Sequence, residues 1–478
     1  MINRFSGLRT RGLRSAVFLG AVTLPLAMAC SADQILDVED IDVASPGSVS
    51  DPAALPAVLA GAIGDFGVSY NGGGDFNQIT LSGQLADELY NTETFPTRIE
   101  NDQRKQQYQS NGSLQNLFYA TNQARASADR AAAGYLSLKK ETDIGLAEAL
   151  NLSALSYITL AENYCNAVPI STVDEAGNFV YGEALTTEQL LNVAVQKADS
   201  ALTNATAAGG VGAAAKRTEQ ARLARVVKAR ALLNLNKFVE AAAAIGGEAG
   251  VPTTFQYNYT HSETTGRQNN GTWGVTVSVA RFGVPDREGV NGLPFLSEGN
   301  TAGTVKDPRV ANVIRGGTGR GFDNSTTQYM QQKYAARASA VIIADGVEAR
   351  LIEAEAALRG GNAAGALTIL NALRSNAALL TLRGYAAGSL PALTQAGTTA
   401  AQVDQLFKER AYWMYLTSHR LGDLRRLVRQ YNRPAESVFP TGAYHKSGTY
   451  GTDVNSPIPQ AEDNNPSFNR AGCVATQA

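Results

Sequence analysis

Three alanine-rich segments of the chain share one spacing, and this repeat restricts the possible folds more than any other feature. The segments are residues 149–160, 224–235 and 349–360, and they align without gaps. In each of them, two alanines five positions apart accompany large apolar residues. This pattern is typical of helices that pack closely against a neighbouring helix. A short turn and another alanine-rich stretch follow the second and third segments, which indicates paired helices.

The repeat predicts a mostly α fold, in which tetratricopeptide-like helix hairpins form a scaffold and each hairpin buries its apolar face against the next. We expect the hairpins at about residues 111–246 and 346–431. The aligned segments begin 75 and then 125 residues apart, so long insertions must separate them. The largest, about residues 247–340, is rich in Gly, Asn, Thr and aromatic residues, and we expect it to be loop-rich with minor β structure.

Residues 1–29 have the pattern of a secretory signal peptide. Residues 1–14 carry four arginines and no acid, and residues 15–29 are apolar or small. The apolar run is shorter than the roughly 20 residues that a membrane-spanning helix needs. Residues 30–478 contain no Pro/Ser-rich linker, so we predict a single domain there. Without the four arginines the formal charge of −2 becomes −6, which does not favour nucleic-acid binding.

Cys30 directly follows the signal-peptide pattern, and two processing routes are open. In the first, the residues before Cys30 act as a bacterial lipobox, and the Cys30 thiol carries a diacylglycerol. In the second, an ordinary signal peptidase recognises the A-x-A sequence of residues 27–29 and releases a soluble protein. We favour lipidation, because a cysteine rarely falls by chance directly after a cleavage site.

Lipidation of Cys30 would leave two cysteines, Cys165 and Cys473. They could pair in an oxidising compartment and close a loop of roughly 300 residues, or they could remain separate buried thiols. Sequence separation does not decide between these alternatives. The chain has no C-x-x-C or H-E-x-x-H motif, and its three histidines lie far apart, so we expect no metal site and no cofactor.

Short motifs follow one another along the chain in a recognisable order. The N-terminal half contains ILDV at residues 35–38, LADEL at 85–89 and YCNAVPI at 164–170. The C-terminal half contains DPR at 307–309, KY at 333–334, LIEAEA at 351–356, DLRR at 423–426, SPIPQ at 456–460 and NNP at 464–466. In this order the motifs resemble those of the SusD/RagB family of outer-membrane nutrient-binding lipoproteins, over almost the whole predicted mature chain.

The resemblance implies a function that composition does not. Proteins of this family are held by lipid on the external face of the outer membrane, where they cap a SusC-like TonB-dependent transporter. They capture a nutrient, commonly an oligosaccharide and sometimes a peptide, and pass it into the transporter barrel. By this resemblance we expect a binding protein that touches the membrane only through its lipid anchor.

Carbohydrate capture requires flat apolar rings flanked by polar groups that pair with hydroxyls. The candidate rings are Tyr257, Tyr259 and Trp273 in the large insertion, and Tyr90 and Phe95 after the LADEL motif. Tyr257 and Tyr259 alternate as in a strand and should share a face, and Trp273 lies in a sequence typical of a turn. For each ring the alternative is that it packs its own loop against the scaffold.

Charged residues near the C-terminus could be mistaken for an active site. They are Glu409, Arg410, Arg420, Asp423 and Arg425. Arg420 and Asp423 are three positions apart on a predicted helix, so we interpret the group as a structural ion-pair network. No G-x-S-x-G, P-loop or dinucleotide-binding pattern is present, and we expect no catalytic residues. The alternative functions are a helical-repeat adaptor that binds a protein and, less favoured, a glycan-degrading enzyme.

Overall fold

The computed structural model describes residues 51–74, 76–174, 178–301 and 304–478. The predicted signal peptide, residues 1–29, and the predicted lipidation site at Cys30 lie outside the described residues. The described residues belong to one compact unit.

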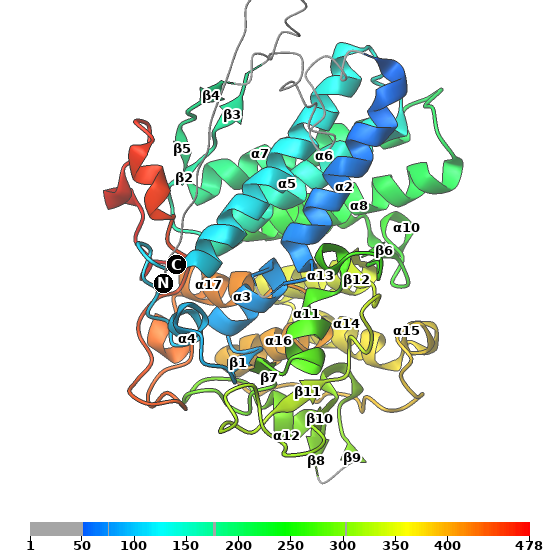
Figure 1. Cartoon of the computed structure of the whole chain (residues 1–478). Coiled ribbons are helices and arrows are strands. Elements are labelled where there is room, and N and C mark those ends of the chain that lie inside the picture. Colours follow the sequence, from blue (N-terminus) through cyan, green and yellow to red (C-terminus); the bar gives the residue numbers. More distant parts are fainter. Residues whose placement is uncertain (1–50, 75, 175–177, 302–303) are drawn as a thin grey trace, which may run out of the picture. The chain divides into compact units, whose positions relative to one another are not determined.

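A scaffold of helices packed side by side forms the larger part of this unit (Figure 1). Its helices, in chain order, are α2 (Leu55–Asn71), α5 (Gly112–Ser137), α6 (Ile144–Asn163), α7 (Thr187–Thr206), α8 (Ala214–Asn234), α9 (Phe238–Ile245), α13 (Gly346–Arg359) and α14 (Ala363–Ser375). The three aligned alanine-rich segments fall in α6, α8 and α13, so the prediction of a mostly α fold built on helix hairpins is confirmed.

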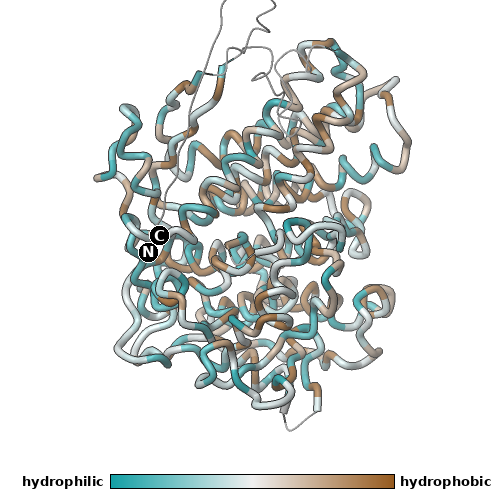
Figure 2. The backbone as a smooth tube through the Cα atoms, in the orientation of Figure 1, coloured by the Kyte–Doolittle hydropathy of each residue, from teal (hydrophilic) through white to brown (hydrophobic). Residues whose placement is uncertain are grey.

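Alanine lets neighbouring helices of the scaffold approach closely. The six aligned alanines, two in each of α6, α8 and α13, are all completely buried. Figure 2 shows hydrophobic residues recurring along these packed helices between hydrophilic ones. A larger side chain at the aligned positions would push two helix backbones apart, which explains why the repeat is visible in the sequence.

Local signals in the sequence set the ends of several scaffold helices. Thr186 and Gln189 form a capping box at the start of α7. Asp143 accepts a hydrogen bond from the Gly145 N–H at 2.9 Å and caps α6. Gly246 ends α9 in the left-handed region, at φ 71°, which costs glycine little.

Two helical segments are long and apolar enough to cross a membrane by length and composition alone. They are Pro52–Asn71, which joins η2 (Pro52–Ala54) to α2, and α6. In the fold α6 is buried among other helices over almost its whole length, whereas the first segment is buried over less than half of its length. The burial of α6 is that of a core helix.

The unit contains further helices outside this scaffold. They are α3 (Gln78–Leu85), α4 (Pro96–Asp102), α15 (Ala377–Leu382), α16 (Thr399–Trp413), α17 (Arg420–Tyr431), η6 (Ala435–Ser437), η7 (Gln460–Asn464) and η8 (Arg470–Gly472). α17 packs against both α3 and α6, and α16 packs against α13. α16 and α17 form the C-terminal hairpin, which is therefore held by elements from the beginning and the middle of the chain.

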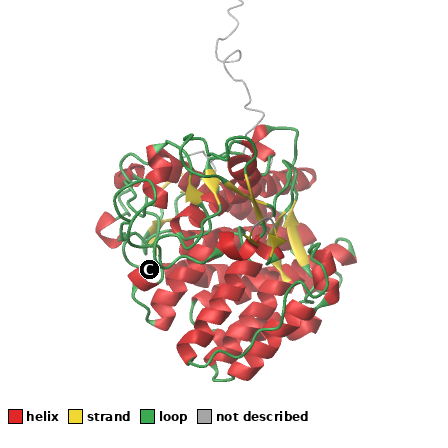
Figure 3. Cartoon of the chain, turned by 90° about the horizontal axis from the view of Figure 1, so that it is seen from below, coloured by secondary structure: helices red, strands yellow, loops and turns green. Residues whose placement is uncertain are grey.

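The segment predicted as a loop-rich insertion, residues 247–340, consists of short elements joined by loops. They are α10 (Gly247–Gly250), β6 (Gln256–Tyr259), η3 (Gly266–Gln268), α11 (Gly271–Trp273), the π-helical turn η4 (Gly274–Ser278), β7 (Phe282–Gly283), α12 (Phe295–Gly299), β8 (Asn300–Thr301), β9 (Thr304–Val305), η5 (Pro308–Val310), β10 (Asn312–Ile314) and β11 (Tyr329–Gln331). Figure 3 shows the scaffold helices stacked together, with most of the loops and short strands gathered on the other side.

The described strands pair two by two in antiparallel fashion. β6 pairs with β12 (Val341–Asp345), which closes the insertion just before α13. β1 (Tyr90–Asn91) pairs with β7 and so connects the insertion to the N-terminal segment. The remaining pairs are β2 (Val168–Pro169) with β5 (Ala184–Leu185), β3 (Thr172–Val173) with β4 (Phe179–Val180), β8 with β9, and β10 with β11.

A disulfide joins Cys165 to Cys473, with the two Cα atoms 4.9 Å apart. Of the two alternatives that the sequence left open, the structure has the pairing. The Cys165 N–H also donates to the Ser456 carbonyl at 3.3 Å. The bond therefore fastens the C-terminal segment to the end of α6.

Candidate ligand-binding site

Two exposed phenylalanine rings flank one arginine at the β1–β7 pair, and we name this group the aromatic platform: Phe95, Arg281 and Phe322. The guanidinium carbon of Arg281 lies 4.9 Å from the centroid of the Phe95 ring and 4.3 Å from that of the Phe322 ring. The two rings are 45 % and 44 % exposed. Large exposed rings held around a cation are available to a ligand.

Backbone hydrogen bonds that converge near Thr92 hold the platform. The Thr92 N–H donates to the Arg281 carbonyl at 2.8 Å, and the Asp323 N–H donates to the Thr92 carbonyl at 3.0 Å. The Phe322 N–H donates to the Ala280 carbonyl at 2.8 Å. Three segments that are distant in sequence are thus joined directly beneath the rings. Phe95 itself precedes Pro96, which starts α4 and favours the extended backbone that Phe95 adopts.

A buried carboxylate fixes the arginines of the platform. Glu93 is fully buried and accepts hydrogen bonds from Arg281 at 2.6 Å and from Arg98 at 2.9 Å. The guanidinium carbon of Arg98 lies 4.4 Å from the centroid of the Phe95 ring. Because Glu93 is ion-paired to both arginines, the two guanidinium groups keep their positions against the ring.

The loop that carries Phe322 is fastened by an ion pair between Asp323 and Lys446. Although burial raises the pKa of Asp323, hydrogen bonds from Lys446 and Thr326 hold it below the usual range. Asp323 therefore stays ionised under all mild conditions, and the ion pair keeps the loop in place.

A cavity of about 310 Å³ adjoins the platform through Arg281, which lines it. Its other lining residues include Gly73, Gly74, Asn269, Asn270, Trp273, Gly274 and Arg337. Trp273 is half-buried, and the guanidinium carbon of Arg337 lies 5.5 Å from the centroid of its ring. An indole ring beside amide and guanidinium groups is the combination that sugar recognition requires.

Among the rings predicted from the sequence, the structure brings Phe95 and Trp273 to this site, places Tyr90 on the adjoining strand β1, and places Tyr257 and Tyr259 on β6. Tyr257 is only 8 % exposed, and its hydroxyl donates to Glu148 at 3.4 Å, so its assignment as a ligand-binding candidate is corrected. Tyr259 shares the inward face of β6 with Tyr257, as predicted, and is half-buried. Tyr90 is also half-buried, and its hydroxyl donates to the Thr327 carbonyl.

Tyr259 packs so closely against α2 that no side chain fits between them. A Cβ atom added to Gly67 would lie 1.8 Å from the Cζ atom of Tyr259. The ring of Tyr259 thus fills space against a helix, which is the alternative considered for each candidate ring.

Sequence reasoning missed Phe322, Arg281 and Arg337. Phe322 follows the glycine-rich stretch 316–321, and an aromatic residue directly after such a turn is a signal that could have been noticed. Nothing in the local sequence distinguishes Arg281 or Arg337 from other surface arginines. Their proximity to aromatic rings arises from the tertiary structure alone.

A larger cavity, of about 490 Å³, lies between α16 and α17, but its charges are already neutralised. Glu409 accepts hydrogen bonds from Arg309 at 2.7 Å and from Arg374 at 2.7 Å. The aromatic residues of its lining, Phe407 and Tyr412, are buried. This cavity therefore has neither an exposed ring nor an unpaired charge among the described lining residues, and the platform is the better candidate site.

The charged residues of the C-terminal hairpin form buried ion pairs. Asp423 accepts two hydrogen bonds from Arg410, both at 3.0 Å, and one from Arg426 at 2.8 Å. Arg426 also donates to Glu355 of α13 at 3.0 Å. These ion pairs hold α16, α17 and α13 together.

Three members of the predicted network, Glu409 as described above, Arg420 and Arg425, have partners outside the hairpin. Arg420 pairs with Asp87 at 2.6 and 2.9 Å instead of with Asp423, because its side chain extends toward the segment after α3. Arg425 donates to the carbonyls of Ala161 and Glu162, at 2.9 and 2.6 Å. Distant segments thus supply the carboxylate that pairs with Arg420 and the backbone carbonyls that bind Arg425.

The turn between α16 and α17 has its backbone groups bound by side chains from elsewhere. The Tyr334 hydroxyl donates to the Leu416 carbonyl at 2.8 Å, and the Tyr70 hydroxyl donates to the Thr417 carbonyl at 2.7 Å. The Leu416 N–H donates to Glu88 at 2.9 Å. These bonds stabilise Leu416 at φ 52°, in a region that a leucine rarely adopts.

Glu88 makes the stability of this turn depend on pH. Burial raises its pKa from 4.5 to about 8, so the folded chain keeps a proton that the unfolded chain releases between these values. The stability that protonated Glu88 contributes is therefore fully present below about pH 4.5 and is lost as the pH rises from there to about 8. Burial lowers the pKa of Lys333 to about 7. Above that pH the folded chain releases a proton that the unfolded chain keeps, so Lys333 makes the stability rise with pH, but only there.

We expect the free energy of unfolding to fall between pH 5 and pH 7 by up to about 2.5 kcal/mol more in the wild type than in Glu88→Gln. Urea denaturation at both pH values measures this difference. Glu188→Gln, at an exposed acid of α7, controls for the loss of one charge. Equal pH dependence in the wild type and in Glu88→Gln would contradict the assignment.

Comparison with known protein structures identifies the fold. No family model and no curated protein sequence matches the chain. A SusD-like carbohydrate-binding protein of Bacteroides fragilis is 16 % identical, with a TM-score of 0.62, and the match covers 88 % of this chain and all of that one. A SusD/RagB family protein of Bacteroides thetaiotaomicron is 14 % identical, with a TM-score of 0.61, over 87 % of this chain and 95 % of that one. The chain therefore has the SusD-like fold that its motifs predicted.

Proposed function

We propose that this chain with a SusD-like fold is a lipid-anchored protein on the outer face of the outer membrane, which binds an oligosaccharide and delivers it to a SusC-like TonB-dependent transporter. The observation that carries the proposal is the aromatic platform: two exposed rings on one fixed guanidinium group, beside a cavity with an indole ring. The chain binds its ligand without altering it.

The chemistry of the platform suits a sugar. The apolar C–H face of a pyranose stacks on an aromatic ring, and guanidinium and amide groups pair with its hydroxyls. A glycosidase would need two carboxyl groups free to exchange protons across the ligand. Glu93, which lies at the platform, is instead buried and ion-paired to two arginines.

The names of similar structures agree with a glycan as ligand. One is a laminarin-binding SusD-like protein, 17 % identical to this chain with a TM-score of 0.58. Another is surface glycan-binding protein A of Bacteroides uniformis, 15 % identical with a TM-score of 0.58. At these identities only the fold is shared, so the ligand of this chain must be measured.

We expect the purified chain to be retarded in native gels that contain one glycan of a panel of laminarin, starch, xylan and dextran. Phe95→Ala and Phe322→Ala should each weaken the affinity for that glycan about tenfold, because each removes one stacking surface. Isothermal titration with oligosaccharides of the glycan measures the effect. Phe179→Ala is the matched control, since Phe179 is 75 % exposed but lies on β4, away from β1 and β7 (Figure 1).

Equal affinities in all three variants would contradict the platform as the binding site. Retardation by no glycan, together with binding of a peptide mixture, would exclude an oligosaccharide as the ligand. Accumulation of reducing ends in the presence of the protein would show that the chain is an enzyme that cleaves the glycan.

The lipid anchor is supported by the position of Cys30 directly after the predicted signal peptide. We expect Cys30→Ala to move the protein from the outer-membrane fraction to the soluble fraction while its circular dichroism stays unchanged. In detergent extracts, the wild-type chain should purify together with a TonB-dependent barrel. Unchanged attachment of Cys30→Ala to the outer membrane would contradict the anchor.

A further inference from the structure

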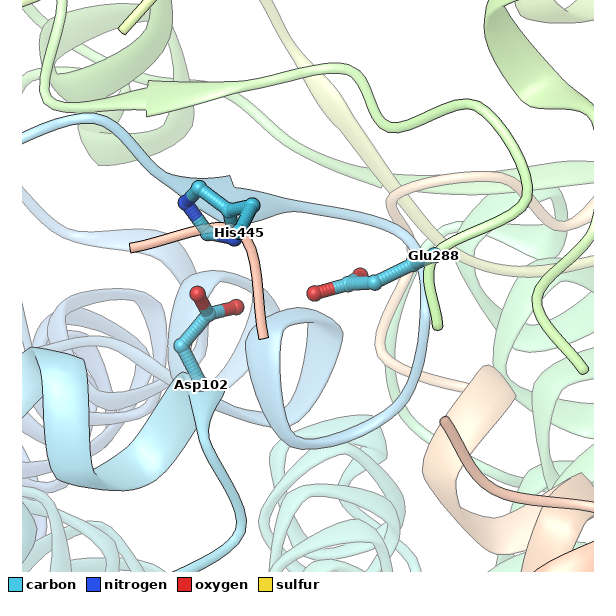
Figure 4. A group of neighbouring side chains, drawn as sticks. All are labelled: Asp102, Glu288 and His445. Carbon is cyan, nitrogen blue, oxygen red and sulfur yellow. The ribbon is translucent and has the colours of Figure 1, made fainter. Parts of the chain in front are cut away.

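Three side chains that commonly ligate metals meet beside the platform, although they come from separate segments. They are Asp102 at the end of α4, Glu288 in the loop after β7, and His445 in the C-terminal segment (Figure 4). One ligand atom of each lies within 4.8 Å of the others. The separation of the histidines in sequence had suggested that no metal site exists, but the fold brings His445 to two acids.

Each of the three side chains is oriented by a hydrogen bond from outside the group. Asp102 accepts at Oδ2 from the Tyr444 hydroxyl at 2.6 Å and from the Asn91 N–H at 3.0 Å. Glu288 accepts at Oε1 from the Tyr450 hydroxyl at 2.9 Å. His445 lies with Nε2 at 2.7 Å from the Asn91 carbonyl. Since a carbonyl only accepts, Nε2 carries a proton, and in the neutral imidazole Nδ1 has the lone pair that can ligate a metal.

The other oxygen of each carboxylate has no donor among the described residues. Asp102 Oδ1 and Glu288 Oε2 are buried without a hydrogen-bond partner, and the two residues are only 1 % and 6 % exposed. The two carboxyl groups lie close enough to share a proton, which is one way to satisfy them. A cation bound between the two carboxylates is the second way, because it would neutralise the repulsion between two buried negative charges.

We propose that Asp102, Glu288 and His445 bind one divalent transition-metal ion of the Zn²⁺ class. An imidazole nitrogen with two carboxylates is a ligand set for Zn²⁺ or Mn²⁺, whereas Ca²⁺ and Mg²⁺ prefer oxygen ligands alone. The outer hydrogen bonds from the tyrosines and to Asn91 are those expected around metal ligands. His445 is exposed, so an ion can reach the site from solvent.

The ion would connect three segments to the platform. Asn91 bonds to both Asp102 and His445 and is followed by Thr92, where the backbone bonds beneath Phe322 and Arg281 converge. The role of the ion is therefore structural, and it does not depend on which ligand the platform takes.

Metal binding to the full chain, purified without a histidine tag and freed of metal by EDTA, tests this assignment. In isothermal titration at pH 7.5 we expect one equivalent of Zn²⁺ to bind, and thermal unfolding to shift upward with Zn²⁺. Glu288→Gln and His445→Ala should each lower the affinity at least 100-fold, and Tyr450→Phe should lower it about 10- to 100-fold by removing one outer hydrogen bond. Glu188→Gln on α7 is the control and should bind as the wild type does.

Circular dichroism confirms that each variant is folded before its affinity is compared. Absence of Zn²⁺ and Mn²⁺ binding to the wild type would show that the two acids merely share a proton, and it would overturn the proposal. Undiminished binding in His445→Ala, or tighter binding of Ca²⁺ than of Zn²⁺, would overturn it as well, because the imidazole would then not be a ligand. None of these outcomes bears on glycan binding, which is measured separately.

Discussion

Replacing Asp423 by asparagine is expected to lower the free energy of unfolding by about 3–5 kcal/mol. Asp423 is buried and pairs with Arg410 and Arg426. Although burial raises the pKa of Asp423, the two guanidinium groups hold it far below the usual range, so it is ionised in the folded chain. The neutral asparagine leaves Glu355 as the carboxylate shared by the two buried arginines. An uncompensated buried charge costs much more than an exposed ion pair contributes.

Urea denaturation followed by circular dichroism measures this loss. The matched control is Asp404→Asn on α16, because Asp404 pairs with Arg433 but its side chain is 61 % exposed. We expect that variant to lose less than about 1 kcal/mol. A loss in Asp423→Asn as small as that of the control would contradict the account of the hairpin as a buried ion-pair network.

Removing the disulfide should have an effect of similar size. The double variant Cys165→Ala/Cys473→Ala is expected to lose up to about 5 kcal/mol in the free energy of unfolding, because the cross-link restricts the unfolded chain over a long loop. The sequence separation of the two cysteines is 308 residues. Denaturation of the oxidised wild type and of the double variant under the same conditions measures the difference.

Reduction supplies the control for this second prediction. A reductant should destabilise the wild type to about the level of the double variant and should leave the double variant itself unchanged. If the wild type keeps its full stability after complete reduction, confirmed by thiol titration, the cross-link contributes nothing and the prediction is wrong.

The helical scaffold could be predicted because its signals are local. Aligned alanines, apolar residues at helical spacing and capping residues such as Thr186 and Asp143 act within a few positions of one another. Each of these signals has its physical effect over one or two helical turns, so it can be read without knowing the path of the chain. The order of the motifs along the chain also predicted that these helices belong to a SusD-like fold.

The binding site could be predicted only in part. Phe95 and Trp273 were identifiable as aromatic residues in polar, loop-rich surroundings. The same reasoning also selected Tyr257, which is buried because β6 pairs with β12 and turns this ring toward the scaffold. A ring in a strand has two faces to choose from, and the pairing partner of the strand settles which face is buried.

Other features depend on contacts between residues that are hundreds of positions apart. Asp87 pairs with Arg420, Cys165 bonds to Cys473, and Asp102 lies beside Glu288 and His445. Local spacing carries no information on such distances, because they follow from how the helices and the insertion pack together. The amino-acid pattern thus specified the helices and their scaffold, whereas the packing of distant segments placed Arg281 between two exposed rings and created the candidate site.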